Sequence, residues 1–442
     1  MNRLQEYLSS HETSEMHPSD IAKILKELED SDLNEAIKLV PKDLVGDVAL
    51  ALPDRYFDFV VESLSVDELS YAVTELESDD QLEFMQELGE VNESVASQVF
   101  EILDEEDKQE ITKLQTYDDD EAGAYMQLEV FTAEKNEIVQ DVIERFAKLR
   151  RANELENIQN LFITDSNAKL QYTVGLDDIL IFDFSKTLEE NITLSDDCFE
   201  PKKGVDSDDI KVIVHDFKQY DLSVMPIVNS YGILIGRITS DDIYDIINEQ
   251  ATEQMYNLAG VNDEAEDDYE ILNAGKKRAT WLSLNLVTAI GASFVIASFS
   301  ATIESIIALA ILMPIVASLG GNVGIQSLTV VVRQLALGEI SKKEAKRVVK
   351  KEVIIALING SIFAIVMGFI AALWFDMNML GVVIALSMII NFFVAGFFGA
   401  VIPLFLRRMN IDPAIGSSVV LTTLTDVVGF FSFLGLATYI LL

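Results

Sequence analysis

Apolar and polar positions follow a helical spacing through the first part of the chain. Apolar residues such as Ile21, Ile24, Leu25 and Leu28 recur every three or four positions, and prolines separate successive stretches. This pattern predicts a stacked array of amphipathic helices, an α-helical superhelical N-terminal domain over residues 1–125.

Over residues 126–240 the pattern changes to short β-prone runs. Two of them, at 158–164 and 170–174, flank a turn and precede an Asp-Asp pair. The same arrangement recurs at 222–228 and 233–239. Two tandem units of this kind resemble a pair of cystathionine-β-synthase (CBS) domains, an α+β regulatory module.

The CBS resemblance implies a possible nucleotide site. In such domains a Thr and an Asp three residues later can hold the ribose of a nucleotide, and here these residues are Thr239 and Asp242. ATP is therefore a possible regulatory ligand. Many CBS pairs bind no nucleotide, so this assignment stays open.

Residues 241–275 are expected to form a connecting (plug) helix and linker. An acidic residue recurs every fourth position along it, at Asp241, Asp245, Glu249 and Glu253. Like charges at this spacing destabilise a helix, so the stripe needs solvent, salt or a bound cation. Both an exposed linker helix and a cation-sensing helix fit the pattern.

Residues 276–442 are predicted to form a transmembrane domain of five helices. A helix needs about 20 apolar residues to cross the hydrocarbon core of a bilayer. Five stretches qualify, at roughly 281–303, 306–335, 353–375, 380–406 and 414–442.

The basic residues predict how these spans are oriented. Lys and Arg precede the first span, fill the loop between the second and third, which includes Lys342 and Lys343, and precede the fifth; the two other loops contain none. The positive-inside rule then places the N-terminus in the cytosol and Leu442 outside. We expect a multi-pass protein of the bacterial cytoplasmic (inner) membrane.

Charge separates the two halves of the chain. Of its 32 basic and 73 acidic residues, 12 and 7 lie from Lys276 onward, a net charge of +5, which leaves 20 and 66 upstream, a net charge of −46. Such an acidic region repels nucleic acid and attracts cations. Ordinary solubility charge is the alternative explanation.

The few Cys and His residues limit the kinds of metal site. Cys198 is the single cysteine, and three separated histidines form no ligand cluster, so an intrachain disulfide and a Cys-based metal site are excluded. A bound metal must be a hard ion held by oxygen atoms. The N-terminus contains no stretch resembling a signal peptide.

Polar residues inside the predicted spans mark candidate ion ligands. Asp426 lies near the middle of the last span, where a carboxylate costs about 2.5–3.5 kcal/mol on insertion scales. Asn322 lies beside Gly320 and Gly324 in the second span. A protonated structural Asp426, and glycines that serve only packing, are the alternatives.

Three segments together resemble the MgtE family of magnesium channels: Tyr117–Met126, Gly320–Gln326 and Asp412–Gly429. The resemblance covers essentially the whole chain. It implies a homodimer in the lipid bilayer with its pore on the two-fold axis. Asp426 then matches the intramembrane aspartate of the family, Asn322 a pore-lining asparagine, and Asp412 an acid at the cytosolic mouth.

The resemblance also identifies cytosolic acids. Asp245 and Glu253 are retained in the connecting helix, whereas Gln254 stands where an acid is common. Asp67 is matched, by a loose alignment, to an acid at the interface of the N-terminal domain.

We therefore predict a Mg²⁺-selective channel that imports magnesium and that closes when cytosolic Mg²⁺ binds its acidic domains. A proton-coupled carrier for divalent cations such as Co²⁺ or Mn²⁺ is the alternative. A CBS-regulated sensor or enzyme ranks last, because the sequence shows no nucleophile–base pair and no phosphate loop.

Overall fold

The computed structural model describes residues 1–11, 13, 16–152, 155, 157–195, 199–260, 271–337, 340, 344–409 and 411–442. Cys198, Lys342 and Lys343 lie outside the described residues. The chain divides into two compact units, Met1–Asn248 and Glu249–Leu442, and each is described by itself. The finer division into four domains stays a prediction from the sequence.

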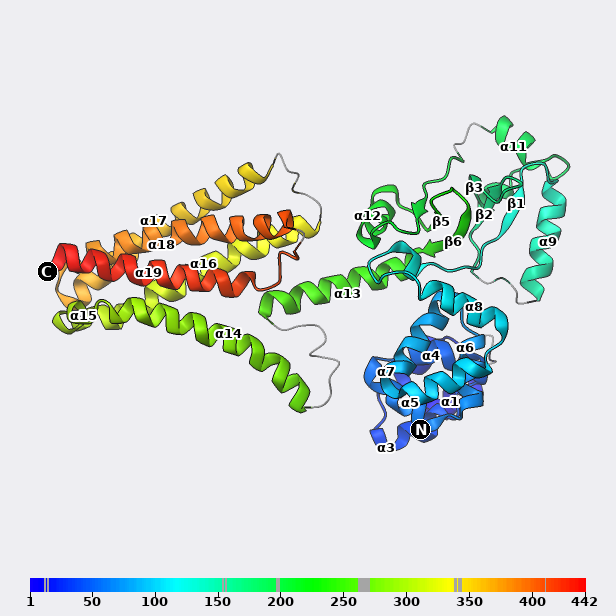
Figure 1. Cartoon of the computed structure of the whole chain (residues 1–442), viewed down its shortest axis with the longest axis horizontal. Helices are drawn as coiled ribbons and strands as arrows, with labels where there is room; N and C mark the ends of the chain where they lie inside the picture. The colour runs from blue at the N-terminus through cyan, green and yellow to red at the C-terminus, as the bar shows by residue number, and fades with distance from the viewer. Residues whose placement is uncertain are drawn as a thin grey trace. The chain divides into compact units, whose positions relative to one another are not determined.

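The first unit begins with short amphipathic helices that stack on one another (Figure 1). Their apolar faces form one core, which includes Ile21, Leu33 and Leu69, all fully buried. The predicted helical array is thus present. Its members are α1 (Asn2–Ser10), α2 (Pro18–Leu25), α3 (Asp30–Ile37), α4 (Val45–Leu50), α5 (Phe57–Ser63), α6 (Val66–Thr74), α7 (Ser78–Ile102) and α8 (Glu105–Leu114).

Two similar α/β modules follow within the same unit. In each, a short first strand pairs in parallel with a second strand, which pairs antiparallel with a third. The first contains β1 (Thr132–Glu134), α9 (Val139–Arg151), β2 (Asn160–Thr164), β3 (Leu170–Gly175), α10 (Leu176–Ile179) and α11 (Leu188–Leu194). The second contains β4 (Gly204–Val205), α12 (Ile210–Tyr220), β5 (Val224–Val228) and β6 (Leu234–Thr239).

The turns of the two modules repeat as well. The side chain of Asp165 accepts hydrogen bonds from the backbone N–H groups two and four residues later, and Asn229 does the same. The turns end with positive φ at Ala168 and Gly232. Both antiparallel pairings shift register at the end of the middle strand. The predicted pair of CBS-like repeats is confirmed.

The N-terminal helices share their core with the second module rather than the first. One cluster of buried apolar residues runs from the helices through Ala122 and Met126 to Met225 and Ile238, whereas the first module has a separate cluster. The backbone groups of Gln127, between α8 and β1, and Arg237, on β6, form hydrogen bonds in both directions. These bonds attach the segment between α8 and β1 to β6. Contact with the second module therefore positions the N-terminal helices.

The predicted connecting helix is α13 (Ser240–Ala259), a continuous 20-residue helix that begins directly after β6. Ile243 and Ile246 are its buried apolar residues, whereas Ile247 is exposed.

Among its described residues, the second unit contains five helices that are long and apolar enough to cross a membrane, as predicted. They are α14 (Ile271–Ala297), α16 (Ile307–Ala336), α17 (Ala345–Phe375), α18 (Asn378–Arg408) and α19 (Ser417–Leu441). The first predicted span, 281–303, is interrupted: α14 ends at Ala297, and the short helix α15 (Ser300–Ser305) follows.

Helices α16, α18 and α19 pack closely against one another (Figure 1). Small residues permit this approach: a Cβ on Gly399 of α18 would lie 2.7 Å from the carbonyl oxygen of Gly324 on α16. By contrast, almost all of the apolar stretch of α14 is exposed. The core of the second unit is thus a bundle to which α14 contributes little.

Candidate functional site

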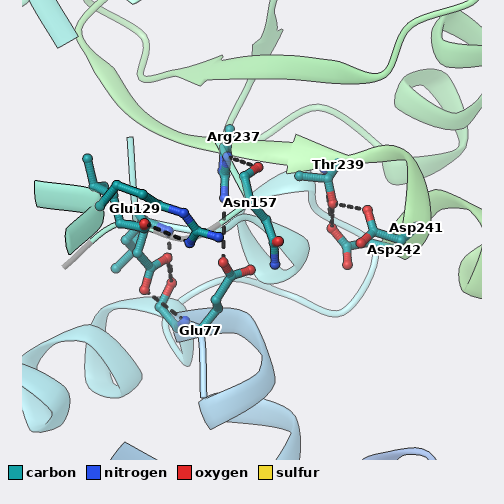
Figure 2. Close-up of polar contacts among 11 residues, drawn as sticks. Glu77, Glu129, Asn157, Arg237, Thr239, Asp241 and Asp242 are labelled. Carbon is teal, nitrogen blue, oxygen red and sulfur yellow. Dashed lines mark hydrogen bonds and ion pairs between the residues drawn. The ribbon is translucent and has the colours of Figure 1, made fainter. Parts of the chain in front are cut away.

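A fully buried arginine marks the contact between the N-terminal helices and the second CBS-like module (Figure 2). Arg237, on β6, donates from Nη1 to the carbonyl oxygen of Asn157 at 3.1 Å. Its Nη2 lies 3.7 Å from Oε1 of Glu77, and its Nε and Nη2 have no hydrogen-bond partner among the described residues. The arginine therefore places a buried positive charge beside the carboxylate of Glu77.

Acidic residues gather at the start of α7, next to this arginine. Glu77 occupies the N-cap position, and Asp79 and Asp80 stand in the first turn, where the helix dipole favours negative charge. The turn is held in place because Ser78 donates from its backbone N and its Oγ to the carboxylate of Glu129, at 3.0 and 2.8 Å.

A second acidic turn begins α13. Thr239, the last residue of β6, donates its hydroxyl to the carboxylates of both Asp241 and Asp242, and its backbone N also donates to Asp242 (Figure 2). This arrangement turns the chain from strand into helix and orients both carboxylates.

The two acidic turns act on each other electrostatically. Burial, reinforced by the neighbouring carboxylates, raises the pKa of Glu77 to about 7 and that of Asp80 to about 8. The positive charge of Arg237 partly opposes this increase at Glu77. Burial and the charges of Asp80 and Asp242 raise the pKa of Asp79 well above its usual range. Burial also raises the pKa of Asp242 to about 6, although the bonds from Thr239 oppose this. We call Glu77, Asp79, Asp80, Asp241 and Asp242 the interface acids.

Repulsion among the interface acids can be relieved by protons or by a cation. Carboxylate oxygens are the ligands that hard divalent cations prefer. Among the described residues, however, no three His, Cys, Asp or Glu side chains converge closely enough to chelate an ion. The structure therefore holds a cation-attracting surface without a preformed chelate.

The sequence predicted only part of this cluster. Asp67 is exposed in the first turn of α6 and belongs to none of these contacts, whereas Asp79 and Asp80 were missed. Their signal was the Ser-Asp-Asp start of a helix after Glu77. The amino-acid sequence alone, however, does not reveal which helix N-terminus faces the CBS module.

The remaining acids of the connecting helix are solvent-facing. Asp245 and Glu249 are exposed, and Glu253 is half-buried and accepts a hydrogen bond from Asn257 at 3.3 Å. Near the end of the helix, Leu258 packs against a cluster of buried residues drawn from α16, α19 and the segment before α19, namely Leu328, Val332, Ala414 and Leu421. The C-terminal end of α13 thus contacts helices of the membrane unit.

The predicted intramembrane residues lie on two neighbouring helices. Asp426 on α19 is half-buried and forms no ion pair with any described basic residue, and Asn322 on α16 is exposed on the surface of the chain. Asp412, just before α19, accepts a hydrogen bond from the backbone N of Ala414 at 2.8 Å. The side chains of Asn322 and Asp426 are thus not enclosed within the single chain.

The glycines near Asn322 serve packing. A Cβ on Gly320 would lie 2.1 Å from the amide nitrogen of Asn391 on α18, and one on Gly324 would lie 3.1 Å from the side chain of Leu421 on α19. The packing interpretation of these glycines therefore holds, and Asn322 beside them is an exposed polar group.

The CBS-like pair forms an open cavity of about 750 Å³. Lys202 lines it, forms an ion pair with Asp216 at 3.0 Å and lies over the ring of Tyr220. Ser240 reaches this cavity, whereas Thr239 and Asp242, the predicted ribose ligands, are not among its lining residues. Instead, they bond to each other and belong to the interface between the helices and the module.

Comparisons with known proteins agree with this architecture. Residues 16–120 match the family model described as the MgtE intracellular N domain, and residues 313–436 match the MgtE model described as a divalent cation transporter. The first segment contains Glu77, Asp79 and Asp80, and the second contains Asn322, Asp412 and Asp426.

Full-length relatives extend the comparison. The chain is 27% identical to the magnesium transporter MgtE of Thermus thermophilus over 99% of this chain and 98% of the relative, and 28% identical to that of Enterococcus faecalis over 75% and 72%. A crystal structure of the cytosolic domain of the Mg²⁺ channel MgtE in complex with ATP is similar with a TM-score of 0.48 and 25% identity, covering 55% of this chain and 98% of that one. The chain belongs to the MgtE family of multi-pass membrane transporters.

Proposed function

We propose that this protein is a homodimeric Mg²⁺ channel that imports magnesium across the cytoplasmic membrane, with its N-terminus in the cytosol and its C-terminus outside. The observation that supports conduction is the placement of Asp426 and Asn322 on adjacent packed helices, with neither side chain enclosed by its own chain. A second copy would supply matching groups across a two-fold axis. The relatives named as magnesium transporters support Mg²⁺ as the substrate.

Mg²⁺ loses its water reluctantly, so a path between two Asp426 carboxylates and amide oxygens can hold it hydrated. Asp412, just before α19 and outside the apolar spans, is suited to the cytosolic mouth of this path. An acid there raises the local cation concentration.

Closure by cytosolic Mg²⁺ rests on the interface acids. With Mg²⁺ absent, their mutual repulsion favours separation of the N-terminal helices from the second CBS-like module. A cation placed among them favours the closed arrangement, provided that it binds that arrangement more tightly than the open one. Asp245, Glu249 and Glu253 would extend the sensing surface along α13.

The connecting helix would pass this change to the membrane unit. It begins at the interface acids and ends at Leu258, which packs on α16 and α19, the helices that present Asn322 and Asp426. A shift of α13 along its axis would therefore reach both pore helices directly.

We also propose ATP as a regulatory ligand in the CBS cavity. Its volume of about 750 Å³ lies in the range of small-molecule sites. Lys202 is suited to a phosphate and Tyr220 to stacking with a base.

The decisive test is ion flux through the reconstituted full-length protein. Replacing Asp426→Asn should abolish Mg²⁺ current, while Asp376→Asn should not, because Asp376 caps α17 with a positive φ that Asn also adopts. Cytosolic Mg²⁺ in the millimolar range should lower the open probability of the wild type. Flux that follows a proton gradient at carrier rates, or that ignores cytosolic Mg²⁺, would contradict the proposal.

A further inference from the structure

One amide in the centre of the membrane unit links the two proposed pore helices. Asn391, in the middle of α18, is completely buried. Its Nδ2 donates to the carbonyl oxygen of Val316 on α16 at 3.0 Å, and its Oδ1 has no hydrogen-bond partner among the described residues. A buried polar group in an apolar helix bundle is unfavourable unless it is bonded, so its presence calls for an explanation.

Two glycines from different helices make room for this amide. A Cβ on Gly320 of α16 would lie 2.1 Å from Nδ2 of Asn391, and a Cβ on Gly429 of α19 would lie 2.7 Å from the same atom. Real Cβ atoms do not approach this closely, so an alanine at either position would displace the amide. The side chain of Asn391 thus occupies a slot formed by α16 and α19.

This contact reaches across helices, unlike that of its polar neighbour. Ser387 lies one turn earlier on α18 and is also fully buried, but its hydroxyl donates to the carbonyl of Val383 on its own helix. A leucine at position 391 would fill a similar volume without an unpaired oxygen. Packing alone therefore does not account for an asparagine here.

The slot lies beside the proposed ion path. Gly320 precedes Asn322 by two residues, and Gly429 follows Asp426 by three, which is less than one helical turn in each case. We propose that Asn391 is a positioning residue that sets the separation and rotation of α16 and α19 at the level of Asn322 and Asp426. This inference rests on the proposed function, because it assigns the ion-binding groups to those two side chains.

The positioning role predicts an effect on ion recognition rather than on assembly. In Asn391→Leu, the hydrogen bond from the side-chain amide to the carbonyl oxygen of Val316 is lost while the slot stays filled. Helices α16 and α19 should therefore settle at a different separation. We expect the Mg²⁺ concentration at half-saturation to rise about tenfold, which corresponds to about 1.4 kcal/mol in binding. We expect a comparable loss of discrimination against Ca²⁺. Dimer content and thermal stability should remain close to those of the wild type.

The experiment measures Mg²⁺ and Ca²⁺ flux over a concentration series in proteoliposomes, together with size and melting temperature in detergent. Ser387→Ala is the control and should retain wild-type half-saturation and selectivity. The variant Gly429→Ala retains Asn391 but displaces its amide group. It should shift the Mg²⁺ half-saturation and the discrimination against Ca²⁺ in the same direction as Asn391→Leu does. If Asn391→Leu does not assemble, Gly429→Ala tests the positioning role instead.

Folded Asn391→Leu or Gly429→Ala protein with wild-type half-saturation and selectivity would overturn the inference. Failure of the proposed function is recognised separately, through Asp426→Asn. If that variant still conducts Mg²⁺, the ion path is misassigned. If it does not conduct while the Asn391 and Gly429 variants behave like the wild type, only the positioning role is wrong.

Discussion

Among the interface acids, Asp80 is unfavourable for folding, and in the proposed mechanism it is useful for sensing. Asp80 is largely buried, and burial raises its pKa to about 8, with further contributions from Glu83 and Asp242. At neutral pH, Asp80 is therefore either protonated or carries a negative charge that the neighbouring carboxylates repel. A bound cation removes this conflict, because it stabilises the ionised form.

Asp80→Asn should accordingly raise the melting temperature of the Mg²⁺-free protein at pH 8 and reduce the increase that Mg²⁺ produces. The reason is that a neutral amide keeps the size of the side chain while removing one repelling charge. Thermal unfolding of the full-length protein in detergent, with and without millimolar Mg²⁺, measures both effects.

Asp67→Asn is the matched comparison, since Asp67 is an exposed acid of the same helical array. It should change neither quantity. A large effect of Asp67→Asn with no effect of Asp80→Asn would instead favour the interface acid inferred from sequence resemblance.

At the scale of elements, backbone approach decides how the membrane helices pack. Helices α17 and α18 meet at Gly368 and Gly381, where a Cβ on Gly381 would lie 2.3 Å from the carbonyl oxygen of Gly368. The contact is with backbone, which cannot rotate away. Small residues thus bring the two helices together in the way that is common in bilayers.

Gly381→Ala should destabilise the protein by about 1–3 kcal/mol, because an added methyl group in a filled contact forces the helices apart. Gly291→Ala on α14 is the control: nothing lies within 4 Å of its added Cβ, and alanine is the better helix former. Unfolding of both variants in detergent gives the comparison, and equal stabilities would show that the α17–α18 contact is looser than described.

At the scale of the whole molecule, charge and pH should act together. The raised pKa values of Glu77, Asp80 and Asp242 mean that the folded state binds protons more tightly than the unfolded one. The stability of the Mg²⁺-free protein should therefore be greatest below about pH 4, the ordinary carboxyl range, as far as these groups are concerned. It falls as the pH rises through 6 to 8 and then levels off.

Mg²⁺ competes with those protons, so the stabilisation it provides should grow between pH 6 and pH 8.5. Inhibition of flux by cytosolic Mg²⁺ should strengthen over the same range. Melting curves and flux titrations at several pH values test this expectation. A Mg²⁺ effect that is constant with pH would mean that ions bind elsewhere than at the interface acids.

Much of this architecture is predictable from the order of residues alone. The period of apolar positions reveals the helical array and the paired strand modules, and five apolar stretches of sufficient length reveal the membrane helices. These features are local, because the period of each segment depends on its own backbone geometry. The same locality made Asp426 visible, since a carboxylate within an apolar stretch is conspicuous in any context.

What only the tertiary structure decided concerns groups brought together from distant segments. Asp79 and Asp242 are far apart in sequence, and no local pattern indicates that the starts of α7 and α13 face each other. Likewise, Asn391 looks like an isolated amide in an apolar span until Gly320 and Gly429 are seen to enclose it. Packing of whole elements sets these contacts, so their energies depend on neighbours that the sequence does not place side by side.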